Sequence, residues 1–156
     1  RLRISMLGGG VHGASNEARE IQIRKGIPLI LQRPLNGYGP GLGGKKLGFA
    51  NPNGQFTIDN GYLAIGLDYG LIGLLAFIAV ICASAYLAWK VGMKAKRSSE
   101  LELALCGFAV MGVWAVSRLV LAQQDNALIV YPVMGMIIGL AYRQWEQEKD
   151  APPGEA

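Results

Sequence analysis

The feature that most constrains this chain is an uncharged run of 21 residues, YGLIGLLAFIAVICASAYLAW, from Tyr69 to Trp89. At about 1.5 Å per residue, a helix of this length spans the roughly 30 Å hydrocarbon core of a bilayer. The run ends in aromatic residues suited to a membrane interface. Four cations follow within eight residues: Lys90, Lys94, Lys96 and Arg97. The pattern predicts a transmembrane helix whose C-terminal end faces the cytoplasm.

Two further apolar stretches, Leu103 to Ser117 and Ala127 to Tyr142, are separated by the short polar link 118–126. Each is shorter than an ideal span, so a buried helix of a large soluble protein is the alternative for each taken alone. Because a strong span precedes them and the link is short, we expect a membrane hairpin instead. The predicted fold class is an all-α polytopic membrane protein, in which an extracytoplasmic Gly-rich loop with a short amphipathic helix precedes three transmembrane helices.

Charge divides the chain into three expected regions. Residues 1–60 are polar and Gly-rich and hold eight basic residues against three acids, a net charge of +5. Residues 61–142 hold the three expected spans, and residues 143–156 form a polar, Pro-rich tail that we expect to be disordered after one or two helical turns. If the cations after the first span are cytoplasmic, residues 1–60 lie on the opposite side, which in a bacterium is the periplasm.

Cysteine and histidine usage excludes several kinds of site. The chain has one histidine and two cysteines, too few for most zinc sites or for a disulfide framework. Cys82 and Cys106 lie inside the expected spans, where they are most simply small apolar packing residues. We expect no metal, no cofactor and no nucleic-acid partner. The sequence starts at Arg1 without a signal-peptide pattern, so we expect a piece of a longer chain.

The segment SNEAREIQIRKG, from Ser15 to Gly26, is predicted to form a short amphipathic helix with Ser15 as its cap and Gly26 as its stop. Ile23 and Ile27, four residues apart, form a stripe that faces the membrane or other helices. Arg19 lies on the same stripe one turn earlier. Spacing alone leaves two interpretations of Arg19 open, a solvated surface charge or a functional cation.

The segment after Pro28 is rich in Gly and Pro and is expected to be an irregular loop. Gly39 to Lys45 matches the pattern GxxxxGK of a nucleotide-binding loop. However, Lys46 stands where such a loop has the Ser or Thr that binds magnesium, and we expect no helix to follow, so this interpretation is rejected. The Asn53-Gly54 pair is a turn signal that predicts a small hairpin.

A polar Asp59-Asn60 pair immediately precedes the first span. The simplest interpretation is that Asp59 caps the helix, although a carboxylate beneath a loop rich in Arg and Lys is also placed to meet a polar headgroup. Asp68 is more unusual, because an ionisable group close to an apolar core is costly unless it faces protein or a wet cavity. If the helix begins near Asp59, Asp68 needs a partner; if it begins near Tyr69, Asp68 is itself the cap.

Several of these segments, taken in order, resemble a known family. They are Arg19 in SNEAR, Pro34-Leu35 with Gly37-Tyr38-Gly39-Pro40-Gly41, Asp59-Asn60-Gly61-Tyr62-Leu63, and the helix start Tyr69 to Leu75. The order and spacing resemble the C-terminal part of the O-antigen ligase and polymerase superfamily, whose pattern combines a loop arginine, a P-L-x-G-x-G turn, a His-Asn-x-Tyr-Leu segment and a Gly-Leu-Ile-Gly-Leu helix start. The match covers about residues 15–75.

The resemblance implies a polytopic inner-membrane glycosyltransferase in which this chain supplies part of a large periplasmic loop and the last few helices. Members transfer a glycan from an undecaprenyl pyrophosphate carrier to a saccharide or lipid-linked acceptor. The pyrophosphate linkage already activates the sugar, so neither metal nor nucleotide is implied. The expected partners are therefore the lipid-linked glycan donor, the acceptor sugar and membrane lipids, and the product is a lipopolysaccharide or an exopolysaccharide.

The resemblance also implies residue roles. Arg19 matches the loop arginine that contacts the donor's pyrophosphate, and a guanidinium can pair bidentately with phosphate oxygens. Asp59 falls where ligases carry the His proposed to activate the acceptor hydroxyl, a departure that favours the polymerase branch over the ligase branch. Asn60 and Tyr62 occupy the matched positions of the same segment and are expected to bind substrate.

Two further arginines are candidate substrate-binding residues. Arg33 has no strict family match, but it precedes the Gly-rich turn and its charge suits an anionic headgroup. Arg118, at the outer end of the second span, is expected either to snorkel to the interface or to join the same site. The alternative to an enzyme is a non-catalytic membrane module, such as a transporter fragment or scaffold, whose basic face binds anionic lipids.

Overall fold

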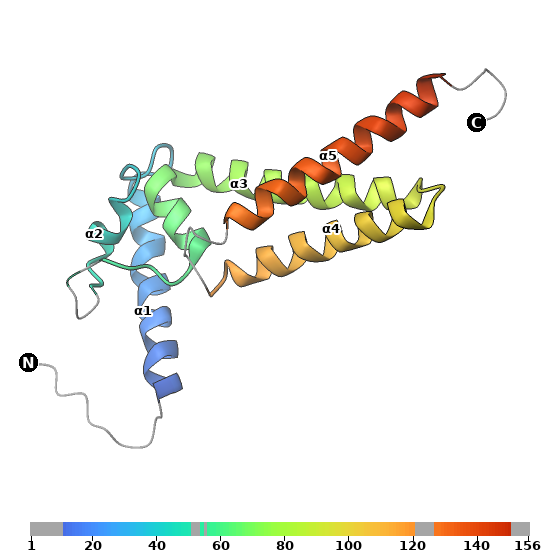
Figure 1. Cartoon of the computed structure of the whole chain (residues 1–156). Helices are drawn as coiled ribbons and strands as arrows, with labels where there is room; N and C mark the ends of the chain where they lie inside the picture. Colours follow the sequence, from blue (N-terminus) through green and yellow to red (C-terminus); the bar gives the residue numbers. More distant parts are fainter. Residues whose placement is uncertain (1–10, 51–53, 55, 121–126, 151–156) are drawn as a thin grey trace, which may run out of the picture. The chain divides into compact units, whose positions relative to one another are not determined.

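A computed structural model describes residues 11–50, 54, 56–120 and 127–150, with the side chains of residues 11–16, 127 and 129 left out of the description. Five helices occur in these ranges, and no strand does (Figure 1). They are α1 (Val11–Gln32), α2 (Gly43–Leu47), α3 (Gly61–Met93), α4 (Ser98–Ser117) and α5 (Ala127–Asp150). The expected all-α class is therefore confirmed for the described residues.

Two of the described helices, α3 and α4, are long and apolar enough to cross a membrane. They contain the first two spans expected from the sequence. Cys82 and Cys106 are free thiols that lie exposed on these helices. Their expected role as small apolar packing residues of the spans stays a prediction.

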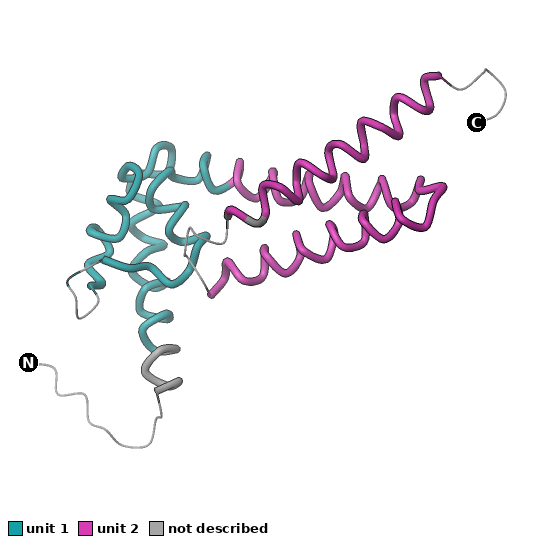
Figure 2. The backbone as a smooth tube through the Cα atoms, in the orientation of Figure 1, with its two compact units in different colours: residues 1–74 teal, residues 75–156 magenta. Residues whose placement is uncertain are grey.

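The chain forms two compact units, residues 1–74 and residues 75–156, and α3 contributes to both (Figure 2). In the first unit, a small core gathers Ile30 of α1, Leu47 of α2, and Leu63 and Leu67 from the start of α3. Tyr38 and Phe49 from the connecting loop pack against the edge of this core. The loop is thus a structural layer of the first unit and not a free connection.

Helix α1 is longer than the sequence predicts. It begins at Val11 and ends at Gln32, so the predicted cap at Ser15 and stop at Gly26 are both wrong. Gly26 is buried against α3, where a Cβ atom would lie 2.7 Å from Leu63 Cδ1. A Cβ here would require the Leu63 side chain to move, so the close packing favours glycine, and α1 continues through it instead of ending.

The loop between α1 and α3 contains more local order than expected. Helix α2 begins at Gly43, inside the stretch expected to be irregular, and it ends at a left-handed Gly48 whose N–H bonds to the Gly44 carbonyl. A single antiparallel bridge joins Ala50 to Phe56. The ends of the predicted hairpin therefore do meet, whereas Asn53 of its expected turn lies outside the described residues.

In the second unit, α4 and α5 pack together in antiparallel directions. Gly107 near the middle of α4 faces Ile137 near the middle of α5, where an added Cβ would lie 2.9 Å from Ile137 Cγ1. At the other end, Arg143 of α5 donates a hydrogen bond to the buried Glu100 of α4. Helix α5 continues eight residues past Tyr142, about the two helical turns expected for the start of the tail.

Candidate functional site

One face of α1 packs on the start of α3. Gln22, Gly26 and Ile30, spaced four residues apart, are the buried positions among residues 17–32 of α1. Gln22 Oε1 accepts a hydrogen bond from the backbone N–H of Asp59 at 3.1 Å, and Ile30 lies where a Cβ on Gly66 would reach it at 2.7 Å. Because these contacts recur about every four residues, α1 and the segment from Asp59 to Gly66 lie side by side.

Arg19 belongs to this packed face. It lies three residues before Gln22, which places it one helical turn from the Gln22–Asp59 hydrogen bond, and it is partly buried. The structure thus brings the Arg19 turn of α1 and Asp59 into the same neighbourhood. By contrast, Ile23 and Ile27, predicted to share a stripe with Arg19, are exposed and lie off the buried face.

The helix start at Asp59-Asn60 corrects one sequence expectation. Asn60, and not Asp59, is the N-cap of α3, because Asn60 Oδ1 accepts the backbone N–H of Leu63 at 2.9 Å. The Asn60 carbonyl also accepts the first intrahelical bond, from Ala64. Asp59 therefore contributes its backbone N–H to α1, and its partly exposed carboxylate is not the helix cap.

Asp68 anchors the Gly-rich loop. Its carboxylate accepts two backbone hydrogen bonds from that loop, Gly41 N to Oδ2 at 2.9 Å and Gly43 N to Oδ1 at 2.8 Å. The sequence left open whether Asp68 caps a helix or needs a partner. Because α3 begins at Gly61, Asp68 lies two turns inside the helix, and its partners are the two loop amides.

The loop docks on a break in α3. Gly70 has φ 72° and ψ −168°, values that L-residues with a side chain rarely adopt. The break frees backbone groups on both sides: Leu71 N donates to the Pro34 carbonyl at 2.6 Å, and the Leu67 carbonyl accepts from Tyr38 N at 2.8 Å. A Cβ on Gly70 would lie 2.6 Å from Pro34 O, so this contact requires glycine.

Cations lie against the aromatic rings of the same loop. The Arg33 guanidinium lies 5.4 Å and the Lys46 ammonium 5.8 Å from the centre of the Tyr38 ring. Lys25 of α1 similarly lies over the Phe49 ring at 5.4 Å. Each distance is within the range of a cation–π interaction. Arg33 thus contacts an aromatic ring of the Gly-rich loop, and its expected role in binding substrate stays a prediction.

The two remaining candidates differ in their surroundings. Tyr62 is half-buried in the first turn of α3, next to Asn60 and Gly61. Arg118 belongs to the second unit, where it is 8% exposed and its guanidinium lies 5.0 Å from the centre of the Trp114 ring. Its burial argues against snorkelling, one of the two roles expected for it, because a snorkelling arginine keeps its charged head in water. The other expected role, as part of the substrate site, stays a prediction.

The described residues contain no group of three or more His, Cys, Asp or Glu side chains that could hold a metal ion. Sequence reasoning missed Gln22, a buried amide that ties α1 to Asp59. The one sequence feature that could have indicated its burial is its position four residues before Gly26, on the same face of the helix.

Comparison with known proteins gives no match: no family model, no curated protein and no solved structure matches this chain. The function must therefore be argued from the residues and their arrangement.

Proposed function

We propose that this chain is part of a bacterial membrane glycosyltransferase of the O-antigen ligase and polymerase type, with polymerase preferred over ligase. The observation that carries the proposal is the hydrogen bond between Gln22 and the Asp59 backbone. It joins the two segments that carry the family-like residues, Arg19 on α1 and Asp59 before α3. A cation can stabilise the charge of a pyrophosphate leaving group, and a carboxylate can accept the proton of an acceptor hydroxyl.

In the proposed reaction, Asp59 accepts the proton of an acceptor sugar hydroxyl as the hydroxyl oxygen attacks the anomeric carbon of the donor. The bond from that carbon to the pyrophosphate oxygen breaks, and its electron pair leaves with the undecaprenyl pyrophosphate. Arg19 pairs with the phosphate oxygens and stabilises their growing charge. A single displacement of this kind inverts the configuration of the anomeric carbon.

The Gly-rich loop and its cations have a supporting role in this proposal. Asp68 and the break at Gly70 fix the loop at Tyr38, Gly41 and Gly43. Arg33, held against Tyr38, supplies positive charge next to the fixed loop. We propose that Arg33, Asn60 and Tyr62 contact the headgroup or the sugar. A rigid loop lowers the entropy lost when a flexible glycan binds.

The proposal places residues 1–60 in the periplasm and α3, α4 and residues 127–142 of α5 in the inner membrane, with the rest of α5 on the cytoplasmic side. Support comes from the antiparallel packing of α4 and α5. The Glu100–Arg143 hydrogen bond and the Gly107–Ile137 contact put α5 alongside much of α4, which is itself long and apolar enough to cross a membrane. A helix packed along a spanning helix shares its membrane layer.

The experiment that tests the proposal replaces single residues in the full-length protein and measures surface polysaccharide by gel electrophoresis. Arg19→Ala and Asp59→Ala are expected to abolish the product, and Asp59→Asn is expected to do so with little change in shape. Arg24→Ala is the matched control, because Arg24 lies on the same helix but forms only an exposed ion pair with Glu20 at 2.8 Å. Membrane levels of each variant are compared by immunoblotting.

The outcomes separate the proposal from its alternative. Loss of long chains with retained single units attached to the lipid core indicates a polymerase, whereas loss of all attached units indicates a ligase. If Arg19→Ala and Asp59→Asn both leave the polysaccharide unchanged at normal protein levels, these residues are not catalytic. A non-catalytic module with a basic lipid-binding face then becomes the better interpretation.

A further inference from the structure

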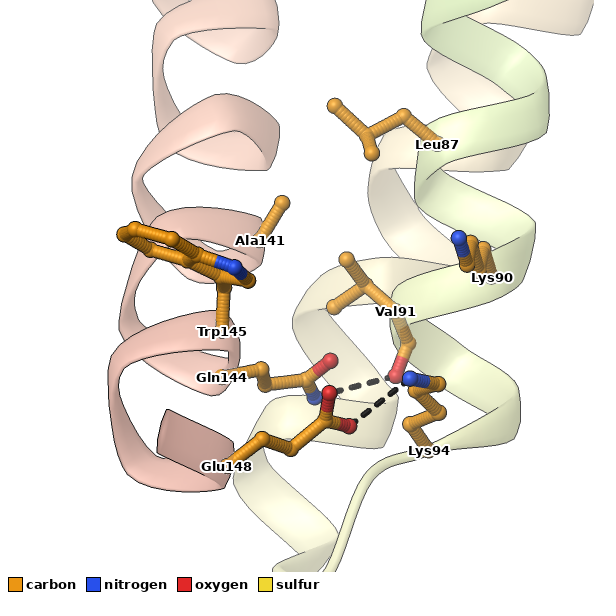
Figure 3. A pocket seen from close by; sticks show the side chains of 8 residues that line it. All are labelled: Leu87, Lys90, Val91, Lys94, Ala141, Gln144, Trp145 and Glu148. Atoms are coloured by element: carbon orange, nitrogen blue, oxygen red, sulfur yellow. Dashed lines mark hydrogen bonds and ion pairs between the residues drawn. The ribbon is translucent and has the colours of Figure 1, made fainter. Parts of the chain in front are cut away.

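A cleft of about 220 Å³ lies in the second unit, between the end of α3 and the last turns of α5 (Figure 3). Lys90, Val91 and Lys94 line it from α3, and Gln144, Trp145 and Glu148 line it from α5. Two hydrogen bonds join the two helices at the cleft: Gln144 Nε2 donates to the Val91 carbonyl at 3.1 Å, and Lys94 Nζ donates to Glu148 Oε1 at 2.7 Å. The cleft is therefore built from two helices that hydrogen bonds hold together.

Positive charge predominates at this cleft. Glu148 is the single carboxylate among the residues that line it, and two lysines face it there. The pKa of Glu148 is lowered from its ordinary value, first by the hydrogen bond from Lys94 and also by the charges of Lys90 and Lys96. Among the residues that line the cleft, two lysines thus face one carboxylate, a surplus of one positive charge.

The lining also changes from apolar to polar along the cleft. Leu87 and Ala141 lie at one end, and Lys94 and Glu148 lie at the other (Figure 3). Trp145, 56% exposed, lies between them, and its ring centre is 5.9 Å from that of Tyr142, with the two rings tilted at 46°. Aromatic rings of this kind mark the level of lipid headgroups, and Lys90 is the first charged residue after the apolar run of α3.

We propose that this cleft binds an anionic phospholipid of the surrounding membrane. Lys90 and Lys94 contact the headgroup phosphate, and the first carbons of an acyl chain lie against Leu87 and Ala141. The occupant is a phospholipid rather than a free phosphate because the cleft offers both an apolar end and a cationic end. This site is distinct from the proposed glycosyltransferase residues, and its existence does not depend on their activity.

Glu148 is expected to weaken the binding of the lipid. Its carboxylate holds Lys94 in the absence of lipid, so it competes with the phosphate for the same ammonium group. Removing its charge is therefore expected to tighten lipid binding, although a hydrogen bond within the protein is lost. Both side chains are about half exposed, which lets them exchange partners without unfolding the helices.

The test uses the purified full-length chain in a neutral detergent and native mass spectrometry with dioctanoyl-phosphatidylglycerol as the probe. Dioctanoyl-phosphatidylcholine serves as the uncharged comparison lipid, and inorganic phosphate serves as the free-anion competitor. Lys90→Gln with Lys94→Gln removes both cleft cations. Lys96→Gln with Arg97→Gln is the matched control, because it removes the same charge from the adjacent turn without touching residues that line the cleft.

We expect the Lys90/Lys94 variant to bind phosphatidylglycerol about tenfold more weakly, a change of about 1.4 kcal/mol. The Lys96/Arg97 variant is expected to change the affinity by less than about twofold, and Glu148→Gln is expected to raise it severalfold. Equal losses in the two double variants would overturn the proposal, since they would indicate a diffuse field. Equal affinity for phosphatidylcholine, or displacement by inorganic phosphate at millimolar concentration, would overturn it as well.

If the Lys90/Lys94 variant does not fold, Glu148→Gln decides the question on its own. An unchanged or lower affinity for phosphatidylglycerol in that variant contradicts the proposal, because the carboxylate then does not compete with the lipid. A higher affinity supports it. Folding is checked beforehand by circular dichroism at 222 nm, where the helices of this chain dominate the signal.

Discussion

Asp68 and Gly43 are joined by a hydrogen bond of 2.8 Å across 25 residues of sequence, and the other carboxylate oxygen of Asp68 accepts the Gly41 N–H at 2.9 Å. One carboxylate inside a helix thus holds the backbone amides of Gly41 and Gly43, the two residues that flank Leu42 in the Gly-rich loop. Hydrogen bonds from backbone amides to a charged acceptor are stronger than neutral ones. The loop is consequently part of the folded unit, and its contacts can be tested by substitution.

Replacement of Asp68 by alanine is expected to lower the stability of the first unit by about 3 kcal/mol, since two amides lose a charged acceptor. Asp68→Asn keeps one acceptor oxygen and is expected to cost less. Thermal unfolding in detergent measures the change, and limited proteolysis in the Gly37–Gly44 stretch reports the released loop. Glu20→Ala, which breaks only an exposed ion pair, serves as the control. A loop that stays protease-resistant in Asp68→Ala would contradict the anchor.

Replacement of Gly70 by alanine is expected to be severe. The backbone at this position is of a kind that costs about 1–3 kcal/mol for a residue with a side chain. The new Cβ would also lie 2.6 Å from the Pro34 carbonyl oxygen, where only backbone can move. Gly112→Ala is the matched control, because a Cβ there meets nothing within 4 Å and the change favours the helix. Unfolding temperatures that fall equally in both variants would contradict the proposed role of the break.

Replacement of the α3 cap is expected to have a smaller and more local effect. Asn60→Ala removes the acceptor of the Leu63 N–H and is expected to cost about 1 kcal/mol, whereas Asn60→Asp keeps a capping oxygen. Hydrogen exchange followed by mass spectrometry should show faster exchange at the first turn of α3 in Asn60→Ala alone. Equal exchange in the two variants would mean that the side chain does not cap the helix.

The ion pair between Lys94 and Glu148 predicts a pH dependence. The pKa of Glu148 is lowered from its ordinary value of 4.5 because Lys94 bonds to the charged form. The pair therefore contributes to stability above pH 4.5, and this contribution is lost as the pH falls through the lowered pKa of Glu148. Carboxyl ¹³C NMR of the labelled protein should record the low pKa, and Lys94→Gln should raise it. A Glu148 pKa that is unchanged in Lys94→Gln would rule out Lys94 as the cause.

The apolar segments of this chain were predictable because membrane-spanning character is a sum over adjacent residues. The uncharged run from Tyr69 to Trp89 lies inside α3, and Leu103 to Ser117 lies inside α4. Both helices require only local composition and length to be recognised. The position of Arg33 before the Gly-rich turn was likewise evident from order along the chain, although its contact with Tyr38 was not.

The predictions from sequence were wrong where a residue distant in the sequence decides the structural role of a residue. Gly26 was expected to stop α1, but it packs closely against Leu63 of α3 and the helix continues through it to Gln32. Asp59 was expected to cap α3, but its backbone is held by Gln22 and the adjacent Asn60 supplies the cap. Each choice depends on a helix that lies more than 30 residues away in the sequence.

The sequence by itself determined that this chain contains apolar helices of membrane-spanning length, a basic Gly-rich segment before them and a cationic turn after the first. Only the tertiary structure decided the structural role of each aspartate. The Asp68 carboxylate accepts hydrogen bonds from the Gly-rich loop, whereas the Asp59 backbone N–H donates to Gln22 of α1. The physical reason is the distance along the sequence over which each effect acts. Hydropathy adds up along neighbouring residues, whereas a hydrogen bond between a carboxylate and a loop amide exists only when folding brings the two together.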